Sequence, residues 1–205
     1  NWAPFPLPPR DIDRVVLSHA HLDHSGYLPA LVRDGFRGQI IATEATRELC
    51  EILLRDSARL QEEEAEFANR HGYSKHKPAL PLYTSEDAER ALSRIVAVDF
   101  HEDFDLGDDL VGRFLPAGHL LGAAIVRVQR GHRSLVFSGD LGRPNDLVMQ
   151  APHKVEAADT LIVESTYGDR DHTDDDPEAV LGRVIRETAA RGGTILNPSC
   201  AVDRA

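Results

Sequence analysis

The feature that most constrains this chain is a nine-residue segment, residues 18–26, with the sequence Ser-His-Ala-His-Leu-Asp-His-Ser-Gly. It follows a short apolar run that is typical of the end of a buried strand, and its final glycine indicates a turn. Three imidazoles and one carboxylate at the end of a strand predict a metal site rather than a solvated loop that is merely rich in histidine. The spacing predicts that His19 and His21 converge on one ion while Asp23 and His24 face a second. Imidazole and carboxylate ligands without a thiolate favour zinc over manganese or iron.

The composition of the 205 residues, 41% hydrophobic and 28% charged, is typical of one globular domain with a core. No apolar run approaches the roughly 18 residues of a membrane span, and no signal peptide opens the chain. Cys50 and Cys200 have no metal-binding spacing, which predicts reduced packing residues of a cytoplasmic protein, or of a nuclear one in a eukaryote. The net charge of -11 argues against a broadly basic nucleic-acid surface. It does not exclude a nucleic-acid enzyme, because metal ions supply positive charge locally.

Hydrophobic periodicity and capping residues predict the remaining elements. The expected helices cover residues 27–33, 44–69, 85–92 and 177–191, the second beginning at Thr43 and the third at Thr84 or Ser85. One strand is expected to end at residue 17. The other expected strands cover residues 39–42, 95–98, 110–115, 123–129, 134–137, 160–163 and 194–196. Strand-turn-helix units that alternate with hairpins predict a layered α/β fold, in which helices cover a sheet.

Three further strand ends carry side chains that can perform chemistry. His119 lies between two glycines after the strand at 110–115, Asp140 follows the strand at 134–137, and Glu164 follows the strand at 160–163. One such residue at a strand end is more often structural. Together with the segment at 18–26, they predict an active site at the edge of a sheet.

These residues carry a resemblance to the metallo-β-lactamase superfamily and, within it, to the β-CASP nucleases that process RNA. The segment His-Ala-His-Leu-Asp-His at 19–24 resembles the family's signature loop, and Gly118-His119 and Gly139-Asp140 resemble its next two metal motifs. Glu-Ser-Thr-Tyr-Gly at 164–168 is similar to the acidic motif of β-CASP enzymes. Residues 198–205 resemble the start of the inserted β-CASP domain, with Cys200 where phenylalanine is usual. The resemblance implies an αββα sandwich over residues 1–192 and a β-CASP domain that begins at 193–205.

The resemblance also implies a ligand set for two zinc ions. One ion would be held by His19, His21 and His119, and the other by Asp23 and His24, with Asp140 bridging both. Two close cations lower the pKa of a shared water, so that hydroxide is available near neutral pH to attack phosphorus. Asp23 would accept the proton from this water. Glu164 would not touch metal but would orient a general-acid histidine and hold it protonated.

The sequence also departs from the family pattern. The aspartate-bearing strand that precedes the signature loop in the family has no counterpart, and neither do the family's later histidines. The remaining histidines match none of its motifs: His71, His76, His101, His132, His153 and His172. We therefore expect a partial chain with a well-formed first metal site, an under-coordinated second site and little or no nuclease activity alone.

The predicted function is zinc-dependent cleavage of RNA phosphodiester bonds, endonucleolytic or 5′-exonucleolytic, with DNA as a related substrate. A homodimer or an RNA-processing complex is the expected assembly. Two alternatives stay open: a hydrolase of small thioesters or lactones with the same metal chemistry, and a non-catalytic subunit of a processing complex. The acidic motif at Glu164 argues against the first, and the full set of expected ligands argues against the second.

Overall fold

A computed structural model of the chain describes residues 5–146, 148–171 and 176–198. It divides into two compact units, Asn1–Glu164 and Ser165–Ala205, and each is described by itself. The first unit contains two β-sheets, which confirms the predicted α/β class.

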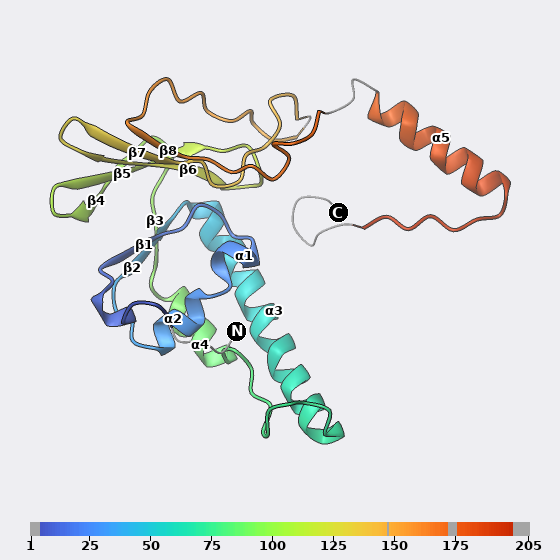
Figure 1. Ribbon diagram of the computed structural model, residues 1–205, viewed down its shortest axis with the longest axis horizontal. Helices are drawn as coiled ribbons and strands as arrows, with labels where there is room; N and C mark the ends of the chain where they lie inside the picture. Colours follow the sequence, from blue (N-terminus) through green and yellow to red (C-terminus); the bar gives the residue numbers. More distant parts are fainter. Residues whose placement is uncertain (1–4, 147, 172–175, 199–205) are drawn as a thin grey trace. The chain divides into compact units, whose positions relative to one another are not determined.

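The first sheet is parallel and is covered by helices on one face (Figure 1). Its strands, in spatial order, are β1 (Arg14–Val16), β2 (Gln39–Ala42) and β3 (Ile95–Ala97). A short 3₁₀ turn, η1 (Pro9–Asp11), precedes β1, and four helices connect the strands: α1 (Leu22–Ser25), α2 (Leu28–Arg33), α3 (Glu44–His71) and α4 (Ser85–Leu92). Buried side chains such as Leu31, Leu54 and Tyr83 form one core between these helices and the sheet. Parallel strands need crossover connections, and the helices provide them while burying this face of the sheet.

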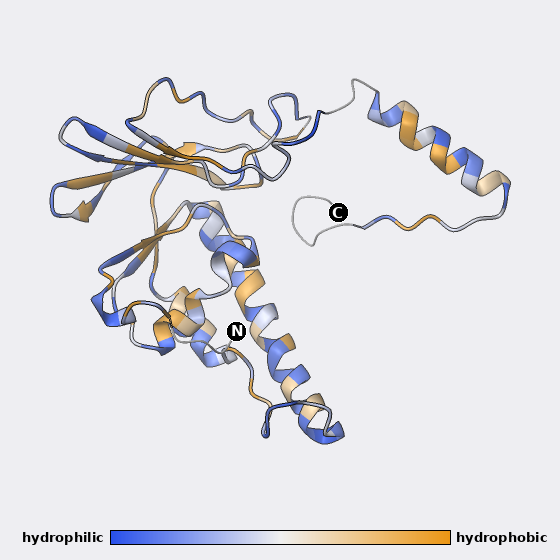
Figure 2. Ribbon diagram, in the orientation of Figure 1, coloured by the Kyte–Doolittle hydropathy of each residue, from blue (hydrophilic) through white to orange (hydrophobic). Residues whose placement is uncertain are grey.

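The second sheet has five strands in sequential order, antiparallel except for its last pair. They are β4 (Asp103–Gly107), β5 (Leu110–Pro116), β6 (Ala124–Arg130), β7 (Arg133–Phe137) and β8 (Thr160–Ile162). Phe104, Phe114 and Val126 of this sheet share a core with Ile41 of β2. Figure 2 shows that strands of both sheets are largely hydrophobic. The two sheets therefore pack face to face, and the layers run helices, first sheet, second sheet.

The helix starts agree with the capping residues that the sequence offers. The Thr43 hydroxyl accepts a hydrogen bond from the Thr46 N–H at the start of α3, and Thr84 forms a capping box with Asp87 at the start of α4. Gly72, with φ of 68°, ends α3 in the left-handed conformation that glycine adopts without strain. The predicted helix at 44–69 is thus confirmed and extends two residues further.

Two predictions from the sequence differ from the structure. Strand β4 was not expected, because its alternating run is only five residues long and contains Asp103, Asp105 and Gly107, residue types that are uncommon in strands; it forms through pairing with β5. The strand expected at 194–196 is wrong, since these residues adopt no regular structure and Leu196 is 88% exposed. A strand needs a neighbour to pair with, and no strand within the described residues is paired with this segment.

The second unit contains the helix α5 (Pro177–Ala190), which begins where the sequence predicted. The side chain of Asp176 accepts a hydrogen bond from the Glu178 N–H, and Pro177 occupies the first helical position. The proposed domain boundary at 192/193 stays a prediction, and residues 199–205 of the expected β-CASP start lie outside the described residues. In the part of the chain that the structure describes, no helix is both long and apolar enough to cross a bilayer.

Candidate metal centre

The segment at 18–26 is fixed by hydrogen bonds to both sheets. The Leu17 N–H donates to the Ile41 carbonyl of the first sheet, and the Ala124 N–H of the second sheet donates to the Ser18 carbonyl. The buried hydroxyl of Ser25 donates to the carbonyl of Ala20 at 2.8 Å. The sequence predicted a loop here, but its second half forms the single helical turn α1, which carries Asp23 and His24.

The loop between β5 and β6 brings His119 to the same place. Its flanking glycines, Gly118 and Gly122, have φ of 69° and 82°, a region that side chains other than glycine rarely adopt. The Ala117 N–H donates to the Ala123 carbonyl and closes the base of the loop. As a result, His119 Nε2 lies 3.2 Å from His21 Nδ1, although the two residues are 98 positions apart.

Asp140 lies near His19 and His119 through one oxygen and near His24 through the other. It follows β7 and Gly139, whose φ of 56° turns the chain. One carboxylate oxygen, Oδ2, is 3.6 Å from His19 Nε2 and 3.5 Å from His119 Nε2. The other oxygen, Oδ1, is 3.3 Å from His24 Nε2. The two oxygens of Asp140 thus face different histidines, Oδ2 facing His19 and His119 and Oδ1 facing His24.

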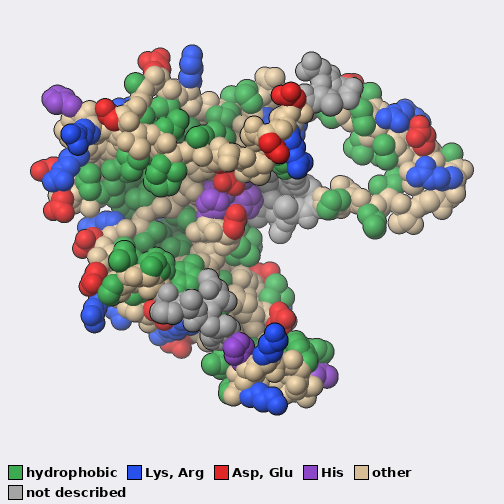
Figure 3. All heavy atoms as spheres, in the orientation of Figure 1, with side chains coloured by type: hydrophobic (Ala, Val, Ile, Leu, Met, Phe, Trp, Pro, Cys, Tyr) green, Lys and Arg blue, Asp and Glu red, His purple; other side chains and the backbone are tan. Residues whose placement is uncertain are grey.

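The first group of ligands has the spacing that a metal ion requires. The ligand atoms of His19, His21, His119 and Asp140 all lie within 4.8 Å of one another, and His19 Nε2 is 3.2 Å from His21 Nδ1. Ligands at the usual 2.0–2.1 Å from a tetrahedral zinc lie about 3.3 Å from each other. Three imidazoles and one carboxylate at these separations fit a divalent ion. Figure 3 shows the histidine and acidic side chains gathered between the two sheets.

The second group is smaller and more open. His24 Nε2 lies 3.5 Å from Asp23 Oδ2, and the Asp23 side chain is 77% exposed. With Asp140 Oδ1, three side chains face this position, and two of them come from the same helical turn. The sequence predicted both groups. Among the described residues, the structure brings the four ligands of the first within 4.8 Å of one another, whereas in the second His24 lies close to each of the two carboxylates.

The electrostatics of the first group favour metal binding over protonation. His19 is fully buried, and burial, followed by the neighbouring imidazoles of His24, His119 and His21, lowers its pKa to about 3. The ring is therefore neutral at neutral pH and keeps a lone pair for a ligand bond. Its Nδ1 lies 3.1 Å from the Ser18 hydroxyl, so Nε2 is the nitrogen that faces the other ligands.

Glu164 lies behind the turn that carries Asp140. Its carboxylate oxygen Oε1 accepts a hydrogen bond of 2.7 Å from the Leu141 N–H, and its own N–H donates to the Ser138 hydroxyl at 3.0 Å. Glu164 therefore supports the backbone next to Asp140. The sequence predicted that Glu164 acts on a histidine and did not predict this backbone contact, because it pairs residues 23 positions apart.

The other histidines lie apart from the ligand atoms of the first group. His71 stacks against Phe67 on α3, with ring centroids 4.0 Å apart. His101 and His153 face each other at 5.5 Å between ring centroids, a pairing that no sequence motif announced. His172 lies outside the described residues.

Comparison with known proteins places the chain in a class. Residues 5–182 match the family model described as the metallo-beta-lactamase superfamily. The match covers most of the chain, and the chain belongs to this superfamily, whose members use divalent metal ions. The predicted membership and fold class are confirmed.

The most similar curated relatives include RNA-directed proteins. The chain is 39% identical over 209 residues to "Ribonuclease TTHA0252" of Thermus thermophilus, covering 100% of this chain and 44% of the relative. It is 34% identical over 201 residues to "Transcription termination factor FttA" of Methanocaldococcus jannaschii, covering 95% and 30%. It is 32% identical over 199 residues to "Endoribonuclease YSH1" of Gibberella zeae, covering 95% and 22%. The chain thus spans less than half the length of these relatives.

The solved structures that the chain matches include two metallo-β-lactamase proteins. A variant of the Cronobacter sakazakii enzyme has a TM-score of 0.39 at 23% identity, covering 70% of this chain and 46% of that one. The YhfI protein of Bacillus subtilis has a TM-score of 0.43 at 16% identity, covering 68% and 45%.

Proposed function

We propose that this chain forms the metal-binding part of a zinc-dependent ribonuclease of the β-CASP type. The observation that carries the proposal is the convergence of His19, His21, His119 and Asp140 at ligand distances. The names of the relatives, a ribonuclease, an endoribonuclease and termination factors, support RNA as the substrate. Endonucleolytic cleavage is the proposed mode, with 5′-exonucleolytic cleavage and DNA as variants to be tested.

The proposed ligand set divides between two ions. His19, His21 and His119 would hold the first zinc ion, Asp23 and His24 the second, and Asp140, which is near histidines of both groups, would be shared between them. Imidazole and carboxylate donors without thiolate suit zinc. Two bound cations would supply a Lewis-acid centre that activates water and neutralises phosphate charge.

The side chains of the chain itself have separate tasks in this proposal. Neutral His19 provides a lone pair because burial, more than its neighbouring imidazoles, keeps its pKa low. Asp23, which is exposed beside the second group, would accept the proton that water loses. Glu164 would keep the turn of Asp140 in place through the Leu141 N–H and orient a protonated histidine that acts as the general acid.

The charge of the chain supports a substrate site built on metal ions. With a net charge of -11, the protein would repel a polyanion over much of its surface. Phosphate binding would therefore depend on positive charge concentrated at the ligand cluster. We propose that the protein is cytoplasmic, or nuclear in a eukaryote, and that it acts as a homodimer or within an RNA-processing complex. In this proposal residues 1–192 form the catalytic domain, and a β-CASP domain begins at residue 193.

The test is RNA cleavage by the protein that contains this chain, with and without a chelator and with zinc restored. Cleavage that the chelator stops and zinc restores supports the proposal. A panel of thioesters and lactones run in parallel separates a nuclease from a small-molecule hydrolase. A protein that binds no metal under these conditions would overturn the nuclease assignment and favour a non-catalytic subunit.

A further inference from the structure

The candidate metal centre depends on two loops that come from different sheets. His19 and His21 follow β1 of the first sheet, and His119 follows β5 of the second. Their ring nitrogens must stay about 3.3 Å apart to share a tetrahedral zinc. Something in the fold has to hold the two loops at this separation, because each loop alone has many conformations.

The start of helix α3 contacts the loop of His119 through two buried hydroxyls. The carbonyl of Gly122 accepts hydrogen bonds from Thr43 Oγ1 at 2.7 Å and from Thr46 Oγ1 at 3.0 Å. Thr43 is 3% exposed and Thr46 is fully buried. The two hydroxyl oxygens are themselves 2.9 Å apart. Each hydroxyl has one proton to donate. When one hydroxyl donates to the other, the second can still donate to the Gly122 carbonyl.

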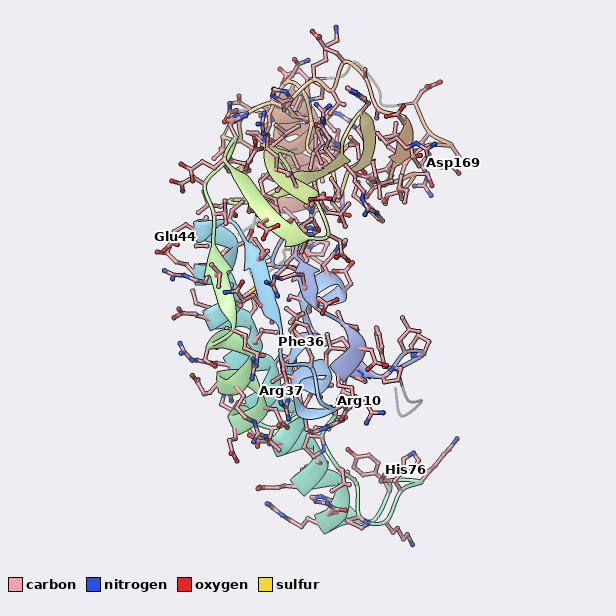
Figure 4. The ribbon with its side chains drawn as sticks, turned by 90° about the vertical axis from the view of Figure 1, so that its left-hand side faces the viewer. Arg10, Phe36, Arg37, Glu44, His76 and Asp169 are labelled. Atoms are coloured by element: carbon pink, nitrogen blue, oxygen red, sulfur yellow. The ribbon has the colours of Figure 1, made fainter. Side chains whose placement is uncertain are left out.

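The contact is too close for any residue but glycine at position 122. A Cβ atom there would lie 2.5 Å from the Thr46 nitrogen and 2.8 Å from each of the two threonine hydroxyl oxygens. The carbonyl of Gly122 also lies at the N-terminus of a 28-residue helix, where the helix dipole favours an electronegative atom. Figure 4 shows Glu44, the first residue of α3, at the end of the helix next to the second sheet, with His76 at the far end.

The same part of α3 also contacts the other ligand loop. Helix α3 contacts α1, and Cys50, fully buried on the second turn of α3, lies near the side chain of Ser25. Ser25 in turn donates to the carbonyls of Ala20 and His21. The first two turns of α3 therefore touch both loops that carry the imidazoles of the first group.

We propose that Thr43 and Thr46 are positioning residues that set the separation between His119 and the imidazoles of the first sheet. Beyond the capping of α3 by Thr43, the two hydroxyls fix the loop 119–122 against the helix, and the packing of α1 against α3 places the loop 18–25 against the same helix. This inference rests on the proposed function in one respect, that a metal ion is the ligand. The alternative is that Thr43 serves only to cap the helix and Thr46 only to pack beside it.

The test uses Thr46→Val, which keeps the shape of the side chain and the capping hydroxyl of Thr43 but removes one donor. In the full chain without metal, amide hydrogen exchange in residues 119–123 should accelerate relative to the parent. Zinc affinity, measured by competition with a chromogenic chelator, should fall about 10–100-fold, the usual effect of losing a residue that orients metal ligands. The absorption bands of bound Co²⁺ should shift as its coordination loosens, and Thr46→Ser should restore all three properties.

Thr84→Val is the matched control, because it removes a capping hydroxyl from α4. It should lower the melting temperature without changing exchange in residues 119–123 or zinc affinity. If Thr46→Val leaves metal binding and loop exchange unchanged, as this control does, the Thr46 hydroxyl does not position the loop and the inference is wrong. The exchange measurement needs no metal, so it stands even if the proposed function fails; a parent chain that binds no zinc would overturn the function, not the contact.

Discussion

The two groups of metal ligands differ in how the fold makes them. The first group draws its side chains from three loops on two sheets, and its histidine His19 is fully buried. The second group draws two of its three side chains from the single helical turn α1, and Asp23 is mostly exposed. Buried ligands held by several elements lose little freedom when a metal binds, whereas exposed ligands must be ordered. We therefore expect the first position to bind metal tightly and the second weakly.

Replacing the shared ligand should have the largest effect. Asp140→Ala removes a carboxylate that faces both groups, so metal content should fall at both positions and metal-dependent cleavage should be abolished. The loss should exceed the roughly 10–100-fold that follows from removing an orienting residue. Metal analysis after dialysis and a cleavage assay measure it. Asp109→Asn, at an exposed turn, should leave both unchanged; an Asp140 variant with parental rate and metal content would show that Asp140 is not a ligand.

Single ligands of the two groups should have unequal effects. His21→Ala removes a member of the first group and should release the tightly bound ion. His24→Ala should leave one tight ion per chain and lose only the weaker one. Zinc titrations monitored by calorimetry distinguish the two. Equal effects on the tight site would contradict the division into a preformed and an open position.

Substitutions of Glu164 test whether its two proposed roles, supporting the turn of Asp140 and orienting a histidine, can be separated. Glu164→Gln keeps an oxygen that can accept the Leu141 N–H, so metal content should stay near the parental value while the alkaline limb of the cleavage pH profile, where the general acid loses its proton, shifts to lower pH. Glu164→Ala leaves this N–H without its partner, at a cost of about 1–3 kcal/mol in the free energy of unfolding, and should also weaken metal binding. If both variants keep the parental pH profile, Glu164 has only the supporting role.

The smallest expected effect is the pH dependence of the metal-free fold. Burial, with the nearby imidazoles, lowers the pKa of His19 from 6.5 to about 3. Between these values the unfolded chain binds a proton that the folded chain excludes, so this contribution to stability is complete above pH 6.5 and declines as the pH falls. In His19→Gln, the free energy of unfolding from urea titrations should therefore change less steeply below pH 6.5, by up to about 1.4 kcal/mol per pH unit. Parallel curves for parent and variant would contradict this.

Local signals in the sequence predicted much of the fold. Thr43, Thr84 and Asp176 each begin a helix where the sequence places a capping side chain, because a cap satisfies backbone N–H groups within a few residues. Strand β4 could not be predicted in the same way, because it exists through pairing with β5. The strand expected at 194–196 failed for the related reason that an apolar pattern alone does not supply a partner strand.

The sequence by itself determined which side chains could hold metal and that each would follow a strand. The chemistry of imidazole and carboxylate, and the local turn after an apolar run, depend only on neighbouring residues. Only the tertiary structure decided the separations: His119 beside His21, Asp140 between the two groups, and the hydroxyls of Thr43 and Thr46 on the Gly122 carbonyl. These contacts join residues that are 76 to 116 positions apart, and packing of the two sheets, rather than any local pattern, brings them together.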